Sequence, residues 1–121
     1  MMSTLGSMTQ HLGNAFTAEL ESAEYPALEG EGTIDAGRTL VTVLGGLNVG
    51  VWEAQPGLIG GVTTDEVFVV LEGRAEVTFE DTKETINIGP GDVVRLNAGQ
   101  RNTWRTFERI RKVSLYVPLG G

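Results

Sequence analysis

Short apolar segments separated by glycine-containing turns run through most of this sequence, and they constrain its fold more than any other feature. The chain has 17 glycines among 121 residues, and most of them lie between these segments. No long segment repeats its apolar residues at helical spacing, whereas several segments alternate apolar and polar residues as strands do. Many short strands at close spacing predict an antiparallel sandwich or barrel.

We expect eight or nine short strands from residue 38 onward. Gly45 and Gly46 predict a tight hairpin turn, because glycine readily adopts the positive φ angles that such a turn requires. The segment 66–72 is apolar at both parities, which predicts a strand covered on both faces. The predicted strands are 38–44, 47–54, 66–72, 74–80, 83–88, 92–96, 102–107 and 110–118.

The first 37 residues lack a comparable strand pattern. Residues 1–15 are polar and aperiodic and predict a mobile arm, and Ala15–Ala23 could form one or two helical turns. Glu29–Gly37 is rich in glutamate and glycine and predicts a loop. We therefore predict one domain, with an N-terminal arm and loop over 1–37 and a barrel over 38–121.

Charge and composition exclude several classes of function. The formal net charge of −7 disfavours a nucleic-acid partner and an anionic membrane surface, because phosphates attract lysine and arginine. No apolar run approaches the roughly 18 residues of a membrane span, and the first ten residues lack the pattern of a signal peptide. The absence of cysteine excludes disulfides, thiolate metal sites and a cysteine nucleophile. We expect a cytoplasmic protein.

Two groups of glycine and acidic residues occur at the spacing of a known pair of motifs. In the first, a glutamate is followed after six residues by a turn glycine; the second opens with Gly-Asp and continues through a turn to another strand. These segments are Glu66–Gly73, Gly91–Asp92, Asn97–Gly99 and the strand from Asn102. The pair resembles the motifs of the cupin superfamily. The resemblance implies an all-β fold, a small antiparallel β-barrel of the jelly-roll type.

Smaller features resemble a subgroup of short single-domain cupins, many of unassigned function. The subgroup shares G-x-W-E near P-G, then a tryptophan, then an R-K pair before an aromatic strand. The corresponding residues here are Gly50–Glu53, Pro56–Gly57, Trp104 and Arg111–Lys112. Relatives include ethanolamine-utilisation cupins and ureidoglycine aminohydrolase-like proteins, whose activities differ, so the resemblance transfers no reaction. Cupins of this kind are often homodimers, and we expect a homodimer here.

The resemblance also implies a metal site that this sequence lacks. A typical cupin binds a divalent metal through three histidines and a glutamate. The first two histidines would fall within 59–62, which reads Ile-Gly-Gly-Val, and Asn102 replaces the third, so only Glu66 remains. The single histidine, His11, is expected to be solvated. Glu53, Glu66 and Asn102 with water could hold Mg²⁺ or Ca²⁺, but our prediction is no metal and no cofactor.

Strand alternation gathers polar and aromatic side chains inside the predicted barrel. The resemblance implies that Glu66 points inward. Residues two apart share a face, so Phe68 would then point inward as well, and Asn102 and Trp104 also share a face. Such a concave, mostly apolar site is typical of small-molecule pockets. Burial favours the neutral form of a carboxyl group, so Glu66 is the predicted acid or base. The predicted substrate-binding residues are Trp52, Phe68, Asn102 and Trp104.

Structural roles remain open for the same residues. Glu66 could pair with Arg95 or Arg105 or bind backbone amides, the aromatic rings could belong to the core, and Asn102 could satisfy a strand end. The basic segment Arg109–Lys112 predicts a solvated strand or a contact at a dimer edge.

Three functions are compatible with this pattern. The first is a metal-independent isomerase, epimerase, cyclase or lyase that uses Glu66 on a small organic molecule. The second is a small-molecule binding or sensing cupin without catalysis, and the third is a structural or accessory dimer with a vestigial pocket. An open pocket with an unpaired Glu66 favours the first, and pairing of Glu66 with arginine favours the second. A pocket filled by its own side chains favours the third.

Overall fold

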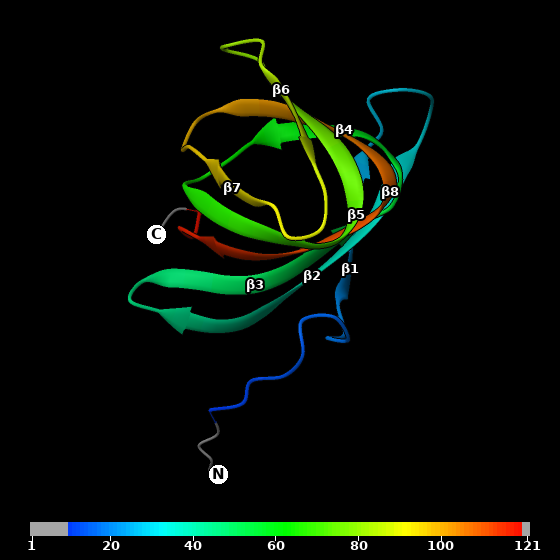
Figure 1. The fold of residues 1–121 in the computed structure, drawn as a ribbon. Helices are drawn as coiled ribbons and strands as arrows, with labels where there is room; N and C mark the ends of the chain where they lie inside the picture. Colours follow the sequence, from blue (N-terminus) through cyan, green and yellow to red (C-terminus); the bar gives the residue numbers. More distant parts are fainter. Residues whose placement is uncertain (1–9, 120–121) are drawn as a thin grey trace.

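The computed structural model describes residues 10–119, and within them eight antiparallel strands form one curled sheet around an apolar core (Figure 1). In chain order the strands are β1 (Glu21–Pro26), β2 (Thr33–Leu44), β3 (Leu47–Ala54), β4 (Gly57–Val62), β5 (Glu66–Phe79), β6 (Thr85–Ile88), β7 (Val93–Leu96) and β8 (Arg101–Tyr116). Their hydrogen-bonded order is β1-β2-β3-β8-β5-β6, with β4 also paired to β8 and β7 to β5. The predicted all-β, jelly-roll type fold is confirmed.

The two longest strands, β5 and β8, organise the sheet. They pair with each other along most of their length, and each pairs on its other edge with two shorter strands, β7 and β6 for β5, and β4 and β3 for β8. Figure 1 shows both strands bending around the core. The sequence pattern predicts two separate strands in each place. Gly73, with φ 90°, instead lets β5 bend and continue.

The inner face of the curled sheet holds the core. Ala75, Val77 and Phe79 all lie in it, as the alternation along 74–80 predicts. The remaining buried core residues are Ala54, Ile59, Phe68, Val70, Ile88, Val94, Leu96, Trp104 and Ile110. The β2–β3 hairpin turns at Gly45 and Gly46, both at positive φ, which confirms the predicted turn.

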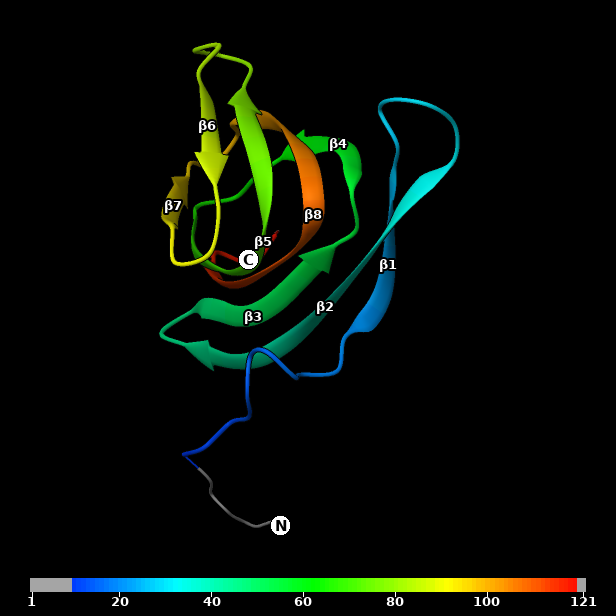
Figure 2. The same cartoon turned by 45° about the vertical axis from the view of Figure 1, so that its right-hand side comes forward.

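The segment before residue 38 differs from the prediction. Strand β1 and the start of β2 occupy residues for which the sequence predicts helix and loop. The β1–β2 hairpin lies beside the barrel (Figure 2), pairing through its whole length. Only one turn forms at 14–18, where the Ala18 amide donates to the Asn14 carbonyl at 2.9 Å. Strand β1 was not predicted because its residues do not alternate between apolar and polar. Residues 1–9, which make up most of the predicted mobile arm, lie outside the described residues.

Two further expectations concern the covered strand at 66–72 and the absence of a membrane span. The outer face of the 66–72 segment is only partly covered within a single chain, where Val67 is 37% exposed and Val69 half-buried. The predicted homodimer therefore stays a prediction. No helix in the described part of the chain is long and apolar enough to cross a bilayer.

Arg111 attaches the N-terminal segment to the outer face of β8. Its guanidinium group donates to the backbone carbonyls of Ala15, Phe16 and Ala18 at 2.8, 2.7 and 3.1 Å, and its Nε donates to Glu53 at 3.0 Å. These carbonyls lie at the end of the single turn at 14–18, where a carbonyl oxygen has no intrahelical donor, and Arg111 supplies the donors. The planar guanidinium group presents several N–H donors that fit these three carbonyl oxygens and the Glu53 carboxylate together. A lysine ammonium group cannot contact all of them.

We expect Arg111→Lys to release the N-terminal segment and to lower the free energy of unfolding by about 2 kcal/mol, because several charge-assisted hydrogen bonds are lost. Hydrogen exchange should show faster exchange of the Ala18 amide. Arg95→Lys is the control, because the Arg95–Asp65 pair is exposed and should contribute under about 1 kcal/mol. Equal effects of the two substitutions would contradict the role assigned to Arg111.

Candidate functional site

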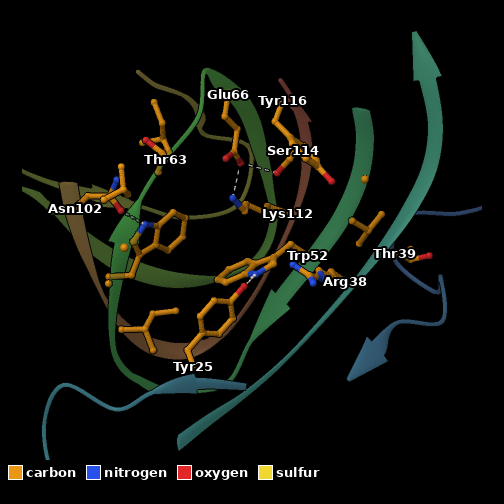
Figure 3. Close-up of a pocket in the computed structure, with 18 of the residues that line it drawn as sticks. Tyr25, Arg38, Thr39, Trp52, Thr63, Glu66, Asn102, Lys112, Ser114 and Tyr116 are labelled. Atoms are coloured by element: carbon orange, nitrogen blue, oxygen red, sulfur yellow. Dashed lines mark hydrogen bonds and ion pairs between the residues drawn. The ribbon is translucent and has the colours of Figure 1, made fainter. Parts of the chain in front are cut away.

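A cavity of about 410 Å³ opens on the inner face of the sheet, lined by residues of β1, β2, β3, β4, β5, β7 and β8 and of the segment that follows β4. Figure 3 shows Glu66, Lys112 and Ser114 close together at one end of the cavity, here called its polar end, while Asn102 and Arg38 lie apart from them. Tyr25, Trp52, Trp104 and Tyr116 provide its aromatic lining. The cavity is therefore open, and it is not filled by the protein's own side chains.

A buried ion pair lies at the polar end of the cavity. Nζ of Lys112 lies 2.6 Å from Oε2 of Glu66, and the Ser114 hydroxyl donates to the same oxygen at 2.8 Å (Figure 3). The Lys112 and Glu66 side chains are only 8% and 13% exposed. Among residues 10–119, no hydrogen bond is made to Oε1 of Glu66. This oxygen is the one that remains available to a ligand.

Three aromatic rings surround the ammonium group of Lys112. Its Nζ lies 4.9, 4.4 and 5.1 Å from the ring centroids of Trp52, Phe68 and Trp104. The faces of these rings attract a cation, but they cannot replace the hydration of an ammonium group. Burial lowers the pKa of Lys112 below that of an ordinary lysine, and the Glu66 carboxylate opposes this shift.

Hydrogen bonds fix the orientation of both tryptophans. The Trp52 indole N–H donates to the Tyr25 hydroxyl at 3.0 Å, and the Trp104 indole N–H donates to the Asn102 side-chain oxygen at 3.0 Å. The two rings meet edge to face with centroids 5.5 Å apart. Because both indole N–H groups are engaged within the protein, these residues offer a ligand their ring faces and edges.

The predicted site residues fall into two groups. Glu66, Trp52, Asn102 and Trp104 line one cavity, as the alternation predicts, and Asn102 holds Trp104 in place. Phe68 is not among the lining residues: it is 0% exposed and packs beneath Trp104 and Lys112, so its contact with a substrate stays a prediction.

The predicted partners of two carboxylates also need correction. Glu66 pairs with Lys112, whereas Arg95 pairs with Asp65 and Arg105 with Glu29. Glu53 follows Trp52 directly, so its side chain lies on the opposite face of β3, where it pairs with Arg109 and Arg111. A cation site formed by Glu53, Glu66 and Asn102 is therefore not assembled.

Lys112 lines the cavity and is absent from the site residues that the sequence predicts. The segment Arg109–Lys112 predicts a solvated or dimer-edge strand, yet Ile110, Arg111 and Lys112 are all buried. Strand alternation is the feature of the sequence that identifies Lys112 as an inward residue. Counting inward positions by twos from Asn102 and Trp104 reaches Lys112 and Ser114 on the same face.

A model of the EutQ-like cupin domain matches residues 41–113, more than half of the chain. The chain belongs to this cupin family. No curated protein matches the sequence at a significant level.

Solved structures of other cupins share the fold. The EutQ protein of Clostridium difficile is 13% identical, with a TM-score of 0.63 over 73% of this chain and 71% of that one. A Rhizobium leguminosarum protein of unknown function is 28% identical, with a TM-score of 0.61 over 69% of this chain and 81% of that one. A DUF861 family protein of Thermotoga maritima is 34% identical over 53% of this chain and 73% of that one, with a TM-score of 0.50.

The residues at the usual cupin metal position do not fit a divalent ion. Positions 59–62 carry no ligand side chain, and the Asn102 oxygen already accepts a hydrogen bond from Trp104. The remaining carboxylate, Glu66, is held by an ammonium group at 2.6 Å, which repels a second cation. In the described part of the chain, no three His, Cys, Asp or Glu side chains cluster, and His11 lies on the surface outside the cavity lining.

Thr106 gives a test of the inner face of β8. Its hydroxyl is buried and has no hydrogen-bond partner among residues 10–119. Because a buried unpaired hydroxyl is costly, we expect Thr106→Val to raise the free energy of unfolding by about 1 kcal/mol, measured by thermal or urea denaturation. Thr85→Val is the control, since it removes a hydrogen bond to Thr78 and should not stabilise the protein. A destabilised Thr106→Val variant would contradict this assignment.

Proposed function

We propose that this EutQ-like cupin binds a small organic molecule in its cavity and transfers a proton on it without a metal ion, as an isomerase, epimerase, cyclase or lyase does. Glu66 is the proposed acid or base. The observation that supports this proposal most is the buried Glu66–Lys112 pair at the end of an open cavity.

The pair has the components that proton transfer next to a carbonyl group requires. Oε1 of Glu66, which has no hydrogen-bond partner among residues 10–119, can accept a proton from a carbon atom within reach. The adjacent ammonium group of Lys112 can stabilise the negative charge that then develops on the substrate oxygen. Both groups are largely removed from water, so their electrostatic interactions are stronger than at a surface.

The lining of the cavity limits the size and chemistry of the ligand. A volume of about 410 Å³ suits a small metabolite, and the ring faces of Trp52 and Trp104 suit a planar or apolar portion. The solved structure of EutQ, at 13% identity, supports only the fold, so the proposed reaction depends on the side chains of this chain.

Binding without catalysis is the second candidate function. It is favoured by one observation, the two hydrogen bonds that already engage Oε2 of Glu66. A carboxylate held by its own protein can serve to orient Lys112 toward a ligand. The open cavity disfavours a vestigial pocket in a purely structural dimer.

Deuterium exchange distinguishes the two candidates. A panel of small 2-oxo and 2-hydroxy acids is first screened for binding by quenching of tryptophan fluorescence. Each ligand that binds is then incubated with the protein in D₂O, and exchange of its carbon-bound hydrogen next to the carbonyl or hydroxyl group is followed by proton NMR. We expect wild-type protein to catalyse exchange.

Glu66→Gln should retain binding and lose exchange by at least about a hundredfold, the usual contribution of a general acid or base. Glu80→Gln is the matched control, because Glu80 is exposed at the end of β5 outside the cavity lining. Exchange that persists unchanged in Glu66→Gln would remove Glu66 from the mechanism. Binding without any exchange in the wild type would favour the non-catalytic function.

A further inference from the structure

We propose that Lys112 forms a covalent imine with a small 2-oxo acid or carboxylated aldehyde, and that Arg38 binds the carboxylate of this ligand. The inference rests on the proposed function of the cavity and names a substrate class for it. It assigns Lys112 the electrophilic role that a metal ion would have elsewhere in the superfamily.

The position of Lys112 is suited to a nucleophilic amine. Its Nζ lines the cavity, where it is surrounded by ring faces and shielded from bulk water. Lysines that are desolvated in apolar pockets are the ones that react with carbonyl groups, because the neutral amine becomes accessible near neutral pH. The lowered pKa of Lys112 agrees with a role as a nucleophilic amine. Glu66, at 2.6 Å, is the only carboxylate that forms an ion pair with Lys112 among residues 10–119.

The step balances with these two residues alone. Lys112 transfers one proton to Glu66, and the resulting amine attacks the carbonyl carbon while the carbonyl π electrons move to oxygen. A second proton moves from nitrogen to that oxygen, which gives a carbinolamine. Glu66 returns its proton to the hydroxyl group, which leaves as water as the C=N bond forms. The product is a protonated imine beside the Glu66 carboxylate, and no oxidant or reductant is needed.

Arg38 supplies the second contact through the register of the sheet. Arg38 pairs with Trp52 across β2 and β3, and Trp52 pairs with Lys112 across β3 and β8. Directly paired residues point to the same face, so the three side chains form a row. Two interstrand spacings separate the Cα atoms of Arg38 and Lys112 by about 10 Å. A ligand of a few carbon atoms can therefore contact both side chains over the Trp52 ring (Figure 3).

The guanidinium group of Arg38 is available for this role. Arg38 lines the cavity and is exposed at its solvent side. It forms no ion pair within the described chain, although Glu21 faces it across β1 and β2. Arginine binds carboxylates through paired, planar donors, so the ligand's carboxylate is the group that it would select.

Reductive trapping tests the imine directly. The full chain is incubated with limiting glyoxylate and sodium cyanoborohydride, which reduces an imine to a stable secondary amine, and modified peptides are mapped by mass spectrometry. The chain contains only two lysines, and Lys83 is exposed at the β5–β6 turn, so it serves as an internal control. We expect Lys112 to be modified about tenfold faster than Lys83. Lys83→Arg should leave the modification of Lys112 unchanged.

A second comparison isolates the role of Arg38. Arg38→Gln should slow trapping by glyoxylate about tenfold, because a charge-assisted contact is lost, but it should leave trapping by acetaldehyde unchanged, since acetaldehyde has no carboxylate. Modification of Lys112 no faster than that of Lys83 would overturn the imine. Equal effects of Arg38→Gln on both aldehydes would overturn the role of Arg38. Glu66-dependent deuterium exchange without trapping would refute this inference and leave the proposed function standing.

Discussion

Lys112→Met should lower the free energy of unfolding by about 3–5 kcal/mol, measured by urea denaturation at neutral pH. The substitution keeps an apolar chain of similar length among the three rings but removes the ammonium group that pairs with Glu66. The Glu66 carboxylate would then remain buried with only Ser114 as a partner. Breaking one side of a buried pair is far more costly than removing both charges, because the remaining charge is desolvated without compensation.

The double variant Lys112→Met/Glu66→Gln should recover most of this loss, to within about 1 kcal/mol of the wild type, because neither charge of this pair remains to be desolvated without a partner. Lys83→Met is the matched control, since Lys83 is exposed and its loss should change stability by about 0.5 kcal/mol or less. If Lys112→Met and Lys83→Met destabilise equally, Lys112 does not form the buried pair described here.

Gly73→Ala should destabilise the protein by about 4 kcal/mol or prevent folding at 37 °C. A Cβ at this position would lie 2.1 Å from the Arg109 carbonyl oxygen and 2.6 Å from the Ile110 Cα, which are backbone atoms of β8. The φ of 90° adds backbone strain for any other residue. Because β5 and β8 meet here, the clash would separate the two long strands that carry Glu66 and Lys112.

Gly91→Ala separates the effect of φ from the effect of close packing. Gly91 has the same φ of 90°, but a Cβ there would meet nothing within 4 Å. It should therefore cost only the strain of the left-handed backbone, about 1 kcal/mol. Circular dichroism during thermal unfolding compares the two variants. Equal losses would show that strain rather than the approach of β8 sets the requirement for glycine at 73.

The sequence predicts strands well where one face is buried and poorly where neither is. The alternation of Ala75, Val77 and Phe79 directly reflects their burial, and the Gly45–Gly46 turn follows from backbone geometry. Strand β1 is mostly polar, and β4 contains three glycines among its six residues, so neither carries an apolar pattern. Both are strands because β2 and β8 offer them edges for pairing, which is a tertiary effect.

The sequence predicts the site residue Glu66 on β5, but it predicts only some of the site residues on β8. The cupin resemblance implies an inward Glu66, and strand alternation extends this orientation to Phe68. Alternation cannot separate a ring that faces a ligand from a ring in the core, so Phe68 and Trp104 look alike in the sequence. The positive charges of residues 109–112 predict a solvent-exposed strand, whereas strand alternation counted from Asn102 and Trp104 places Lys112 on the inner face. A buried lysine needs a carboxylate from another strand, and only the register of β5 against β8 reveals that partner.

Proton NMR of protein labelled with ¹⁵N at the lysine side chains tests the buried pair most directly, because the chain has only two lysines. We predict that the ammonium protons of Lys112 exchange slowly with water, that those of Lys83 exchange too fast to observe, and that Glu66→Gln shifts or removes the Lys112 signal. Equally fast exchange at both lysines, unaffected by Glu66→Gln, would show that Lys112 does not face the cavity beside Glu66.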